Sequence, residues 1–388
     1  MTELAEFGEC TRTLHAGATS AKLLKTPGPV VQRGSTVLMP TAEALYDATQ
    51  TTYGRGGLAT HKALCETLSE LEHAERTFIY PSGLAAITGV LQALTGAGDH
   101  ILVSDAAYNP TRRFLDGTLA RFGVRATYYD PTATAEEIAA LIEPETRLIY
   151  MESPASLTFE MQDIPAIAAM ARARNLITVV DNTWAAGVLF KPLDHGVDVS
   201  IQALTKYVCG HSDVFMGSAA ASGRVVERLA RSSYEIGWAV SPDDAYLALR
   251  GLRTLHSRLT HHGASALKVA QWLQDQPEVA SVLCPALPSF AGHDLWRRDF
   301  TGLCGLFGAI LKPVDRSRVD AMVESLQLFG LGYSWGGFES LALPCDPQLV
   351  PRLASGRLDG PLLRLHIGLE GADDLIADLR RGLDSLTA

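Results

Sequence analysis

Two ionisable residues closely follow two apolar runs in the middle of the chain. Asp181 comes directly after the run at residues 177–180, and Lys206 comes two positions after the run at residues 197–204. The length and β-branched content of both runs are typical of buried parallel strands. Because ligands of an open α/β sheet bind outside the carboxyl ends of its strands, this carboxylate and this amine could face one bound molecule.

Pyridoxal phosphate is a molecule that such a pair could hold. Its aldehyde forms a Schiff base with a lysine, and its ring accepts electrons well only while a carboxylate keeps the pyridine nitrogen protonated. Thr205, next to the lysine, offers a hydroxyl to the phosphate. Spacing alone leaves an alternative open, in which a surface lysine and a capping aspartate never meet.

Size and charge narrow the class of protein. The 388 residues are enough for two domains with a large core. With 47% hydrophobic and 20% charged residues, the chain has the composition of an ordinary soluble globular enzyme. Its 33 basic and 43 acidic residues give a formal net charge of −10, which argues against nucleic acid or an anionic membrane as a partner.

The cysteines and the N-terminal residues indicate the cellular compartment in which the protein is expected. The six cysteines are scattered without metal-ligand spacing, which predicts reduced thiols and no metal site. We interpret Cys209, close to the lysine, as a packing residue. The N-terminal residues include acidic side chains and no apolar signal segment, and no stretch is long and apolar enough to span a bilayer. We therefore expect a cytoplasmic protein.

Strand and helix patterns alternate along most of the chain. Besides the two runs above, strands are predicted at residues 77–80, 101–104, 124–129, 147–151 and 214–222, with helices between them. This alternation predicts an α/β fold in which residues 61–255 form a large domain on a mostly parallel sheet flanked by helices. Right-handed crossovers would bring the strand ends to one rim. Residues 256–388 alternate again and predict a smaller C-terminal α/β domain, whereas residues 1–60 lack periodicity and predict an extended arm held by a neighbouring subunit.

Two segments carry groups suited to a phosphate. Ser82 and Gly83 stand at a strand-to-helix junction, where unpaired backbone N–H groups and the positive end of the helix bind anions. In the stretch YGRGG, Arg55 can make paired bonds to a phosphate, and Tyr53 can add a hydroxyl. An ordinary helix cap and a turn with an exposed arginine remain the alternatives.

Four further residues carry candidate or polar side chains. Tyr108 follows a predicted strand, so its ring could stack on a flat cofactor or move a proton at the rim, unless it only packs a loop. Arg364 lies in a strand that is otherwise apolar apart from His366, and a substrate carboxylate or a structural salt bridge could pair with it. The adjacent His261 and His262 are interpreted as solvated polar residues and not as ligands.

The segment DNTWAAGVLFKPLDHGVDVSIQALTKYVCGHSDVFMG resembles the lysine region of the pyridoxal-phosphate enzymes of cysteine and methionine metabolism, in particular the bacterial cystathionine β-lyases. Matching blocks run from about Thr11 to the C-terminus. The resemblance implies an aspartate-aminotransferase-like fold with pyridoxal phosphate on Lys206 and Asp181. It also implies that the backbone at Gly83 and Leu84 binds the phosphate.

The same resemblance implies roles for residues outside the lysine segment. AAYNP resembles a block in which a tyrosine, here Tyr108, stacks over the cofactor ring. Tyr53 and Arg55 match residues that reach the cofactor phosphate of the adjacent chain. This implies an obligate oligomer, which we expect to be a homotetramer built from dimers that share active sites. Arg364 matches the arginine that binds the substrate α-carboxylate.

The implied reaction is the cleavage of L-cystathionine, an amino-acid thioether, to homocysteine, pyruvate and ammonia in methionine biosynthesis. Lys206 and Tyr108 would be its catalytic residues. Ser334 and Trp335 in SWGGFES would contact the substrate, and they favour this β-lyase reaction because the related γ-lyases and γ-synthases usually lack the tryptophan. A γ-lyase or γ-synthase, a cysteine or cystine desulfhydrase, and a non-catalytic α/β binding scaffold remain alternatives.

The sequence departs from the family pattern at two positions. Gly56 stands where some β-lyases carry a second arginine for the far end of cystathionine. Ala203 replaces a serine that is common in the superfamily, which removes one potential hydroxyl for the phosphate. The preferred thioether, and any activity on cystine or cysteine, stay open.

Overall fold

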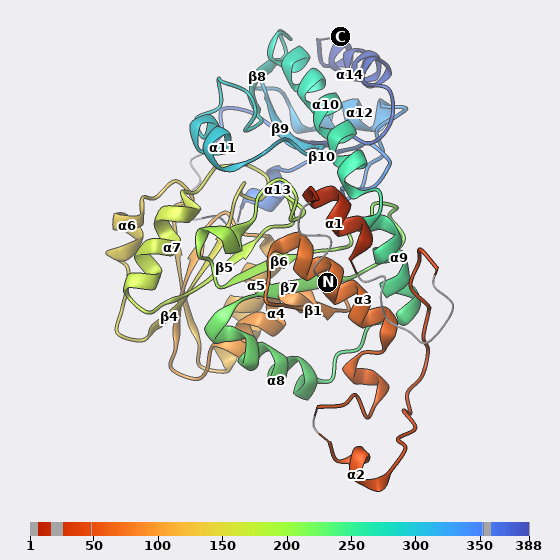
Figure 1. The fold of residues 1–388 in the computed structure, drawn as a ribbon. Coiled ribbons are helices and arrows are strands. Elements are labelled where there is room, and N and C mark those ends of the chain that lie inside the picture. The colour runs from red at the N-terminus through yellow and green to blue at the C-terminus, as the bar shows by residue number, and fades with distance from the viewer. Residues whose placement is uncertain (1–6, 17–25, 48, 351, 353–357, 388) are drawn as a thin grey trace.

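The computed structural model describes residues 7–16, 26–47, 49–350, 352 and 358–387. Parts of the predicted arm, residues 1–6, 17–25 and 48, therefore lie outside the described residues. Two α/β units lie one above the other, and the arm leads away from the lower unit (Figure 1).

Seven strands form the larger sheet, in the order β1-β7-β6-β5-β4-β2-β3. They are β1 (Arg76–Tyr80), β2 (His100–Ser104), β3 (Arg125–Tyr129), β4 (Thr146–Glu152), β5 (Ile177–Asp181), β6 (Val199–Gln202) and β7 (Gly217–Ala221). Neighbouring strands are parallel except at β7, which is antiparallel to both β1 and β6. The predicted mostly parallel sheet is confirmed, although the run at residues 197–204 forms a strand only over its central four residues.

Helices cover both faces of this sheet. They are α3 (Ala59–Glu72), α4 (Gly83–Leu94), α5 (Asn109–Arg113), α6 (Ala135–Ala139), α7 (Ile164–Ala173), α8 (Val226–Ile236) and α9 (Pro242–Leu252). Along β4, Leu148 and Tyr150 belong to the apolar cluster under α4 and α8, whereas Ile149 and Met151 belong to the cluster on the opposite face. This alternation follows from the period of two along a strand, and it fixes which side chains are available at the strand ends.

A smaller sheet carries the C-terminal part of the chain. Its strands are β8 (Val279–Leu283), β9 (Leu306–Leu311), β10 (Leu341–Pro344) and β11 (Leu362–His366), all antiparallel in the order β10-β11-β9-β8. The helices of this part are α10 (Leu255–Gln274), α11 (His293–Asp299), α12 (Arg316–Ser325), α13 (Asp346–Leu349) and α14 (Ala372–Thr387). The predicted smaller α/β unit is confirmed. A domain division at residues 60 and 255 stays a prediction, although α3 begins at Ala59 and α10 at Leu255.

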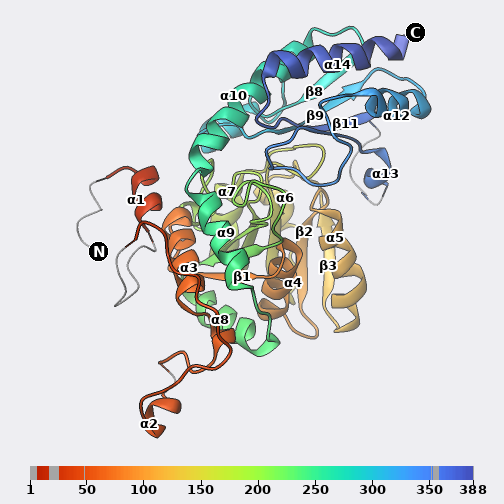
Figure 2. The same cartoon turned by 90° about the vertical axis from the view of Figure 1, so that its right-hand side faces the viewer.

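The arm lies apart from the chain's own core. Helix α1 (Glu9–His15) lies beside α3, but the segment with α2 (Ala42–Leu45) extends away from the body (Figure 2). Large apolar side chains on this segment are almost fully accessible, with Leu38 at 91% and Tyr46 at 85% exposure. Such side chains are available to bury against another surface.

Candidate active site

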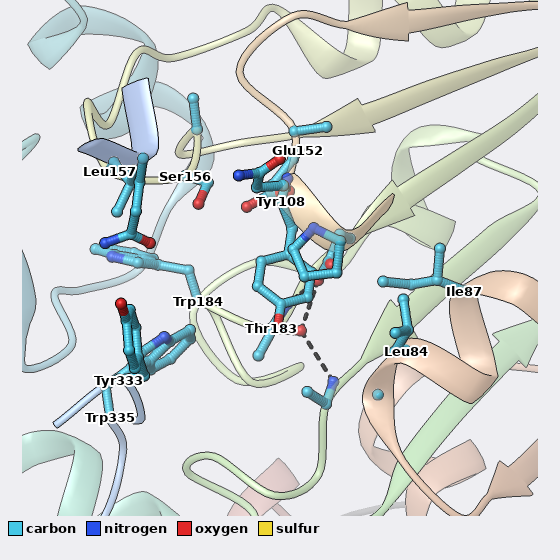
Figure 3. A pocket seen from close by; sticks show the side chains of 18 of the residues that line it. Leu84, Ile87, Tyr108, Glu152, Ser156, Leu157, Thr183, Trp184, Tyr333 and Trp335 are labelled. Atoms are coloured by element: carbon cyan, nitrogen blue, oxygen red, sulfur yellow. Dashed lines mark hydrogen bonds between the residues drawn. The ribbon is translucent and has the colours of Figure 1, made fainter. Parts of the chain in front are cut away.

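A cavity of about 670 Å³ opens at the carboxyl edge of the larger sheet, where the loop before β10 and the strand β11 approach it. Nine of the twelve predicted site residues line it: Ser82, Gly83, Leu84, Tyr108, Asp181, Thr205, Lys206, Trp335 and Arg364. In Figure 3, Leu84 and Ile87 lie on one side of the cavity and Tyr333 and Trp335 on the other, with Tyr108 between them. The sequence therefore predicted nine residues of the wall, and the folded chain brings them together.

Lys206 and Asp181 line this one cavity, as the proposed cofactor requires. The Lys206 amine donates a hydrogen bond to Ser334 Oγ at 3.0 Å and lies 5.4 Å from the centre of the Trp335 ring. Burial, and then the positive charge of Arg364, lower the pKa of Lys206 to about 8, against the opposing effect of Asp181. A larger fraction of the amine is therefore neutral and nucleophilic near neutral pH.

Asp181 is a buried carboxylate that makes no ion pair with any described side chain. It accepts hydrogen bonds from Thr183 N at 3.1 Å and from Thr183 Oγ1 at 2.5 Å. The Thr183 oxygen in turn accepts from the Ala203 N–H at 2.9 Å, and Figure 3 shows this short chain of bonds. Burial raises the pKa of Asp181, while these bonds and Lys206 oppose the rise. A cationic ring nitrogen would supply the charge partner that this carboxylate lacks.

The N-terminus of α4 forms an anion-binding edge of the cavity. Ser82 caps the helix, with its hydroxyl accepting from Ala85 N at 3.0 Å. A Cβ atom on Gly83 would lie only 2.5 Å from Ala203 Cβ, so the backbone comes this close only because the residue is glycine. The first N–H groups of a helix have no partner within the helix, and those at Gly83 and Leu84 border the cavity.

Thr205 lies in the cavity wall, but its hydroxyl is already engaged. It donates to Met216 O at 3.1 Å and accepts from Met216 N at 2.9 Å. Because a hydroxyl has one proton to donate, a bond from Thr205 to a phosphate would require the bond to Met216 O to break. Its predicted role at the phosphate stays a prediction.

Tyr53 and Arg55 do not line the cavity of their own chain. Both lie on the arm, where the Arg55 guanidinium is stacked between the rings of Tyr53 and Tyr234, at 5.3 Å and 5.1 Å from their centres. Gly56, the departure noted above, lies in the same short turn, η1 (Gly54–Gly56). The expectation that Tyr53 and Arg55 serve an adjacent chain stays a prediction.

Glu152 is a cavity residue that the sequence analysis missed. It ends β4 directly beside Asp181 on β5, and its carboxylate accepts the Tyr108 backbone N–H at 2.7 Å. Burial, and then the charge of Asp181, raise its pKa well above the usual range. The pKa of Tyr108 is raised as well, first by burial and then by these two carboxylates. An acidic residue at the end of a predicted strand, on the same rim as Asp181, was the signal that could have found it.

Arg364 faces the cavity from β11. Its Nη2 donates to Tyr333 O at 2.7 Å and to Ser334 O at 3.1 Å, and no described carboxylate lies within ion-pair distance. Ser334 itself reaches the site through its bond to Lys206. A salt bridge was one alternative for Arg364, but its contacts in the described chain are to backbone carbonyls. The guanidinium therefore remains available to a bound carboxylate.

Three further arginines at the cavity were not predicted: Arg112, Arg113 and Arg352. Arg112 forms a buried ion pair with Asp105 and lies 3.6 Å from the centre of the Tyr128 ring. Arg352 donates to Ser156 O and Thr158 Oγ1. With Arg364 and Lys206, these side chains make the cavity favourable for anions, in line with a phosphate and a carboxylate.

Other site classes find no support within the described residues. No cluster of three or more His, Cys, Asp or Glu side chains in that part of the chain could hold a metal ion. None of the six cysteines is in a disulfide, and Cys209 is buried in the apolar core, which confirms its interpretation as a packing residue. None of the described helices is long and apolar enough to cross a membrane.

The residues present fit pyridoxal phosphate. A buried carboxylate without an ion pair, an amine with a lowered pKa and a helix N-terminus that admits only glycine all face one cavity. These are the groups needed for the ring nitrogen, the aldehyde carbon and the phosphate.

Comparisons with known proteins agree with this fit. A family described as "Cys/Met metabolism PLP-dependent enzyme" matches residues 10–384. The chain is 42% identical to a cystathionine β-lyase of Haemophilus influenzae, over 97% of this chain and 98% of the relative. It is also 42% identical to the cystathionine β-lyase MetC of Escherichia coli, over 96% and 97%. A crystal structure of cystathionine γ-lyase from Lactobacillus plantarum complexed with L-serine matches with a TM-score of 0.92 at 31% identity, covering 98% of this chain and 100% of that chain.

Proposed function

Because the chain belongs to the family of pyridoxal-phosphate-dependent enzymes of Cys/Met metabolism, we propose that it is a carbon–sulfur β-lyase that cleaves L-cystathionine. The products would be homocysteine, pyruvate and ammonia, as in methionine biosynthesis. The observation that carries the proposal is that Lys206, Asp181 and Arg364 line one cavity at the carboxyl edge of the sheet. The relatives named cystathionine β-lyase, which match over nearly the full chain, support the choice of substrate.

Each residue has a distinct task in this proposal. When bound, pyridoxal phosphate supplies an electron sink for the bonds at the substrate Cα. Asp181 would pair with the positive ring nitrogen, and the N-terminus of α4 would bind the phosphate. Arg364 binds the substrate α-carboxylate and so orients the Cα–H bond, an effect that can contribute several kcal/mol. Lys206 would hold the cofactor, and its amine would take the proton from Cα.

Tyr108 and the loop before β10 complete the proposed site. The Tyr108 ring would stack on the cofactor, and its hydroxyl would assist proton transfer. Ser334 accepts a hydrogen bond from the Lys206 amine, and Trp335 limits the space beside it. Since the γ-lyases and γ-synthases usually lack this tryptophan, Trp335 supports β-cleavage over γ-cleavage.

The proposed oligomer is a homotetramer of cytoplasmic chains, built from dimers that share their sites. Two observations support an oligomer: the exposed apolar side chains of the arm, and the position of Tyr53 and Arg55 outside their own cavity. Within such a dimer these two residues would bind the phosphate in the adjacent chain.

Product analysis tests the reaction. Purified protein supplied with cystathionine should release pyruvate, whereas γ-cleavage would release 2-oxobutyrate. The Lys206→Ala variant is the matched control and should release neither, because it lacks the amine that acts on Cα. Normal pyruvate release by this variant would contradict the assignment of Lys206.

The visible spectrum tests the cofactor independently. A protein that holds pyridoxal phosphate on Lys206 should be yellow, and borohydride should bleach it. A colourless protein that does not take up the cofactor would instead favour a non-catalytic scaffold.

A further inference from the structure

A group of four rings that contact one another lies next to Lys206. The Tyr207 ring is 5.3 Å from the ring of His262, 5.8 Å from that of His366 and 5.5 Å from that of Trp335, measured between centres. Both histidines are buried, at 0% and 1% exposure. Only Trp335 of these four residues also lines the cavity.

Because His262 is buried, the expectation that it is solvated is wrong. On α10 it lies one position from the exposed His261, about a hundred degrees further round the helix, and so it faces the core.

Strand β11 holds the loop that carries Ser334 and Trp335. We call residues 333–338 the 333–338 loop. Arg364 donates to the carbonyls of Tyr333 and Ser334 at the start of this loop. Two residues further along the same face of β11, His366 Nε2 lies 3.0 Å from the Gly336 N–H nitrogen. The loop is thus fixed at two points by alternate residues of one strand.

The hydrogen bonds assign a tautomer to each histidine. His366 Nε2 lies 3.0 Å from the Gly336 nitrogen and 3.2 Å from Gly337 O. The shorter contact requires Nε2 to accept from Gly336 N–H, which places the proton of the neutral ring on Nδ1. His262 Nδ1 donates to Ile367 O at 2.8 Å, so His262 Nε2 is an acceptor. Burial, before any other cause, lowers the pKa of His366 to about 3 and that of His262 to about 4, which keeps both rings neutral.

Each histidine has a second ring nitrogen, and these two nitrogens are complementary in hydrogen bonding. His366 Nδ1 and His262 Nε2 are buried and have no hydrogen-bond partner among the described residues. One is a donor and the other an acceptor, and the ring centres are 5.4 Å apart. One buried water molecule can bridge such a pair, and a buried polar site of this kind is where structural water is found.

The surrounding backbone leaves the 333–338 loop little freedom to shift. Gly336 has a positive φ of 82°, and a Cβ atom there would lie 2.8 Å from Tyr207 N. A Cβ atom on Gly305 would lie 3.0 Å from His366 Nδ1. Because position 336 is glycine, the loop backbone packs directly on the chain at Tyr207, next to the lysine. Because position 305 is glycine, the backbone there packs directly against the His366 ring.

We propose that His366 and His262, joined by one buried water molecule, are positioning residues that hold the 333–338 loop against Lys206. By fixing Gly336, they keep Ser334 hydrogen-bonded to the Lys206 amine and Trp335 beside it. The inference goes beyond the proposed function, because the geometry that it concerns belongs to the lysine and its partners, whichever thioether is cleaved.

Four variants separate this role from a general effect on folding. His366→Leu removes the acceptor for Gly336 N–H, whereas His366→Gln can place an amide oxygen near the same point. His262→Asn keeps a donor for Ile367 O and removes the acceptor that faces His366. The matched control is His261→Asn, one position away on the solvent side of α10.

Two measurements are made on each folded variant. The first is kcat and KM on cystathionine, and the second is the pH at which the cofactor-free protein takes up pyridoxal phosphate at half its maximal rate. His366→Leu and His262→Asn should lower kcat about 10- to 100-fold, because a small displacement near reacting groups has effects of that size. Both should also move the pH midpoint of uptake, since Ser334 no longer bonds to the lysine amine. His366→Gln should restore most of kcat and the original midpoint, and His261→Asn should change neither.

A purely structural role predicts a different result. In that case His366→Leu and His262→Asn would lower the melting temperature, while the folded fraction kept the original kcat and pH midpoint. That outcome would overturn the proposal. If His366→Leu fails to fold, the comparison of His262→Asn with His261→Asn tests the proposal. His262→Asn is suitable because it retains the bond to Ile367. An unchanged kcat and an unchanged pH midpoint of cofactor uptake in His262→Asn would then be sufficient to reject the proposal.

Discussion

At Lys206, burial and the nearby guanidinium of Arg364 act in the same direction, since each disfavours the charged amine and lowers its pKa. Asp181 opposes this effect but does not reverse it. The amine is therefore protonated below about pH 8 and neutral above it. Only the neutral form is a nucleophile toward an aldehyde.

Cofactor uptake by the cofactor-free protein should therefore depend on pH. We expect its rate to rise as the pH increases through about 8 and to level off above that value. In Arg364→Gln the midpoint should move to higher pH, because the positive charge that lowers the pKa of Lys206 is removed. Stopped-flow absorbance across a pH series checks this. A midpoint that stays constant or moves to lower pH would contradict the assigned cause.

Asp181 accepts hydrogen bonds from the backbone and side chain of Thr183. In Asp181→Asn, the side-chain oxygen can still accept from Thr183, but the negative charge is lost. Turnover should fall about 100-fold or more, because the ring nitrogen would no longer be held in its charged form. Thr183→Val, which keeps the carboxylate and removes only the hydroxyl, should have a much smaller effect. Steady-state kinetics of the two variants, each with saturating cofactor, provide the comparison.

Among the secondary-structure elements, α4 has the most restrictive geometry. Its first residue, Gly83, packs against Ala203, so the helix N-terminus and the turn before Lys206 are fixed relative to each other. An added methyl group at this point would displace one of the two. The position of the bound phosphate and that of the lysine are therefore linked.

Gly83→Ala tests this link. The added Cβ would lie 2.5 Å from Ala203 Cβ, so we expect the affinity for pyridoxal phosphate to fall at least about tenfold and stability to fall by about 1–3 kcal/mol. Gly117→Ala is the control, because nothing lies within 4 Å of its new methyl group. Cofactor titration by visible absorbance and thermal unfolding measure the two effects. Normal cofactor affinity in Gly83→Ala would show that the N-terminus of α4 does not bind the phosphate.

At the scale of the assembled protein, the open point is whether the arm of one chain contributes residues to the cavity of an adjacent chain. Tyr53 and Arg55 carry groups suited to a phosphate but lie outside their own cavity. Because a two-fold dimer presents the same contacts twice, an arm that serves the adjacent chain would do so in both directions.

Mixed dimers test this arrangement. Arg55→Ala and Lys206→Ala chains should each have little activity alone. If the sites are shared, unfolding and refolding them together should restore activity to about a quarter of the native value, because one site in each mixed dimer then contains both native residues. Each variant refolded by itself is the control. No recovery in the mixture, with mixed dimers verified by mass, would mean that Arg55 acts within its own chain or not at all.

The sequence by itself determined the fold class and nine residues of the cavity wall, Asp181 and Lys206 among them. Apolar runs and their period are local properties, so the strands at β5 and β6 and the edge that carries Asp181 and Lys206 could be predicted from residue types alone. The junction at Ser82 and Gly83 was predictable for the same reason, because a cap and a glycine next to a helix pattern are neighbours in the chain.

Only the tertiary structure decided which groups are buried and what they bond to. Glu152 accepts the N–H of Tyr108, which lies 44 residues away in the sequence, and His262 bonds to Ile367, which lies 105 residues away. Neither contact can therefore be predicted from a local sequence pattern. Thr205 was predicted to offer its hydroxyl, yet that hydroxyl is bonded to Met216. Burial depends on which distant segments pack together, and a pKa or a free hydrogen-bonding group follows from burial. Residue types therefore identified the reactive groups, and packing set their partners and charges.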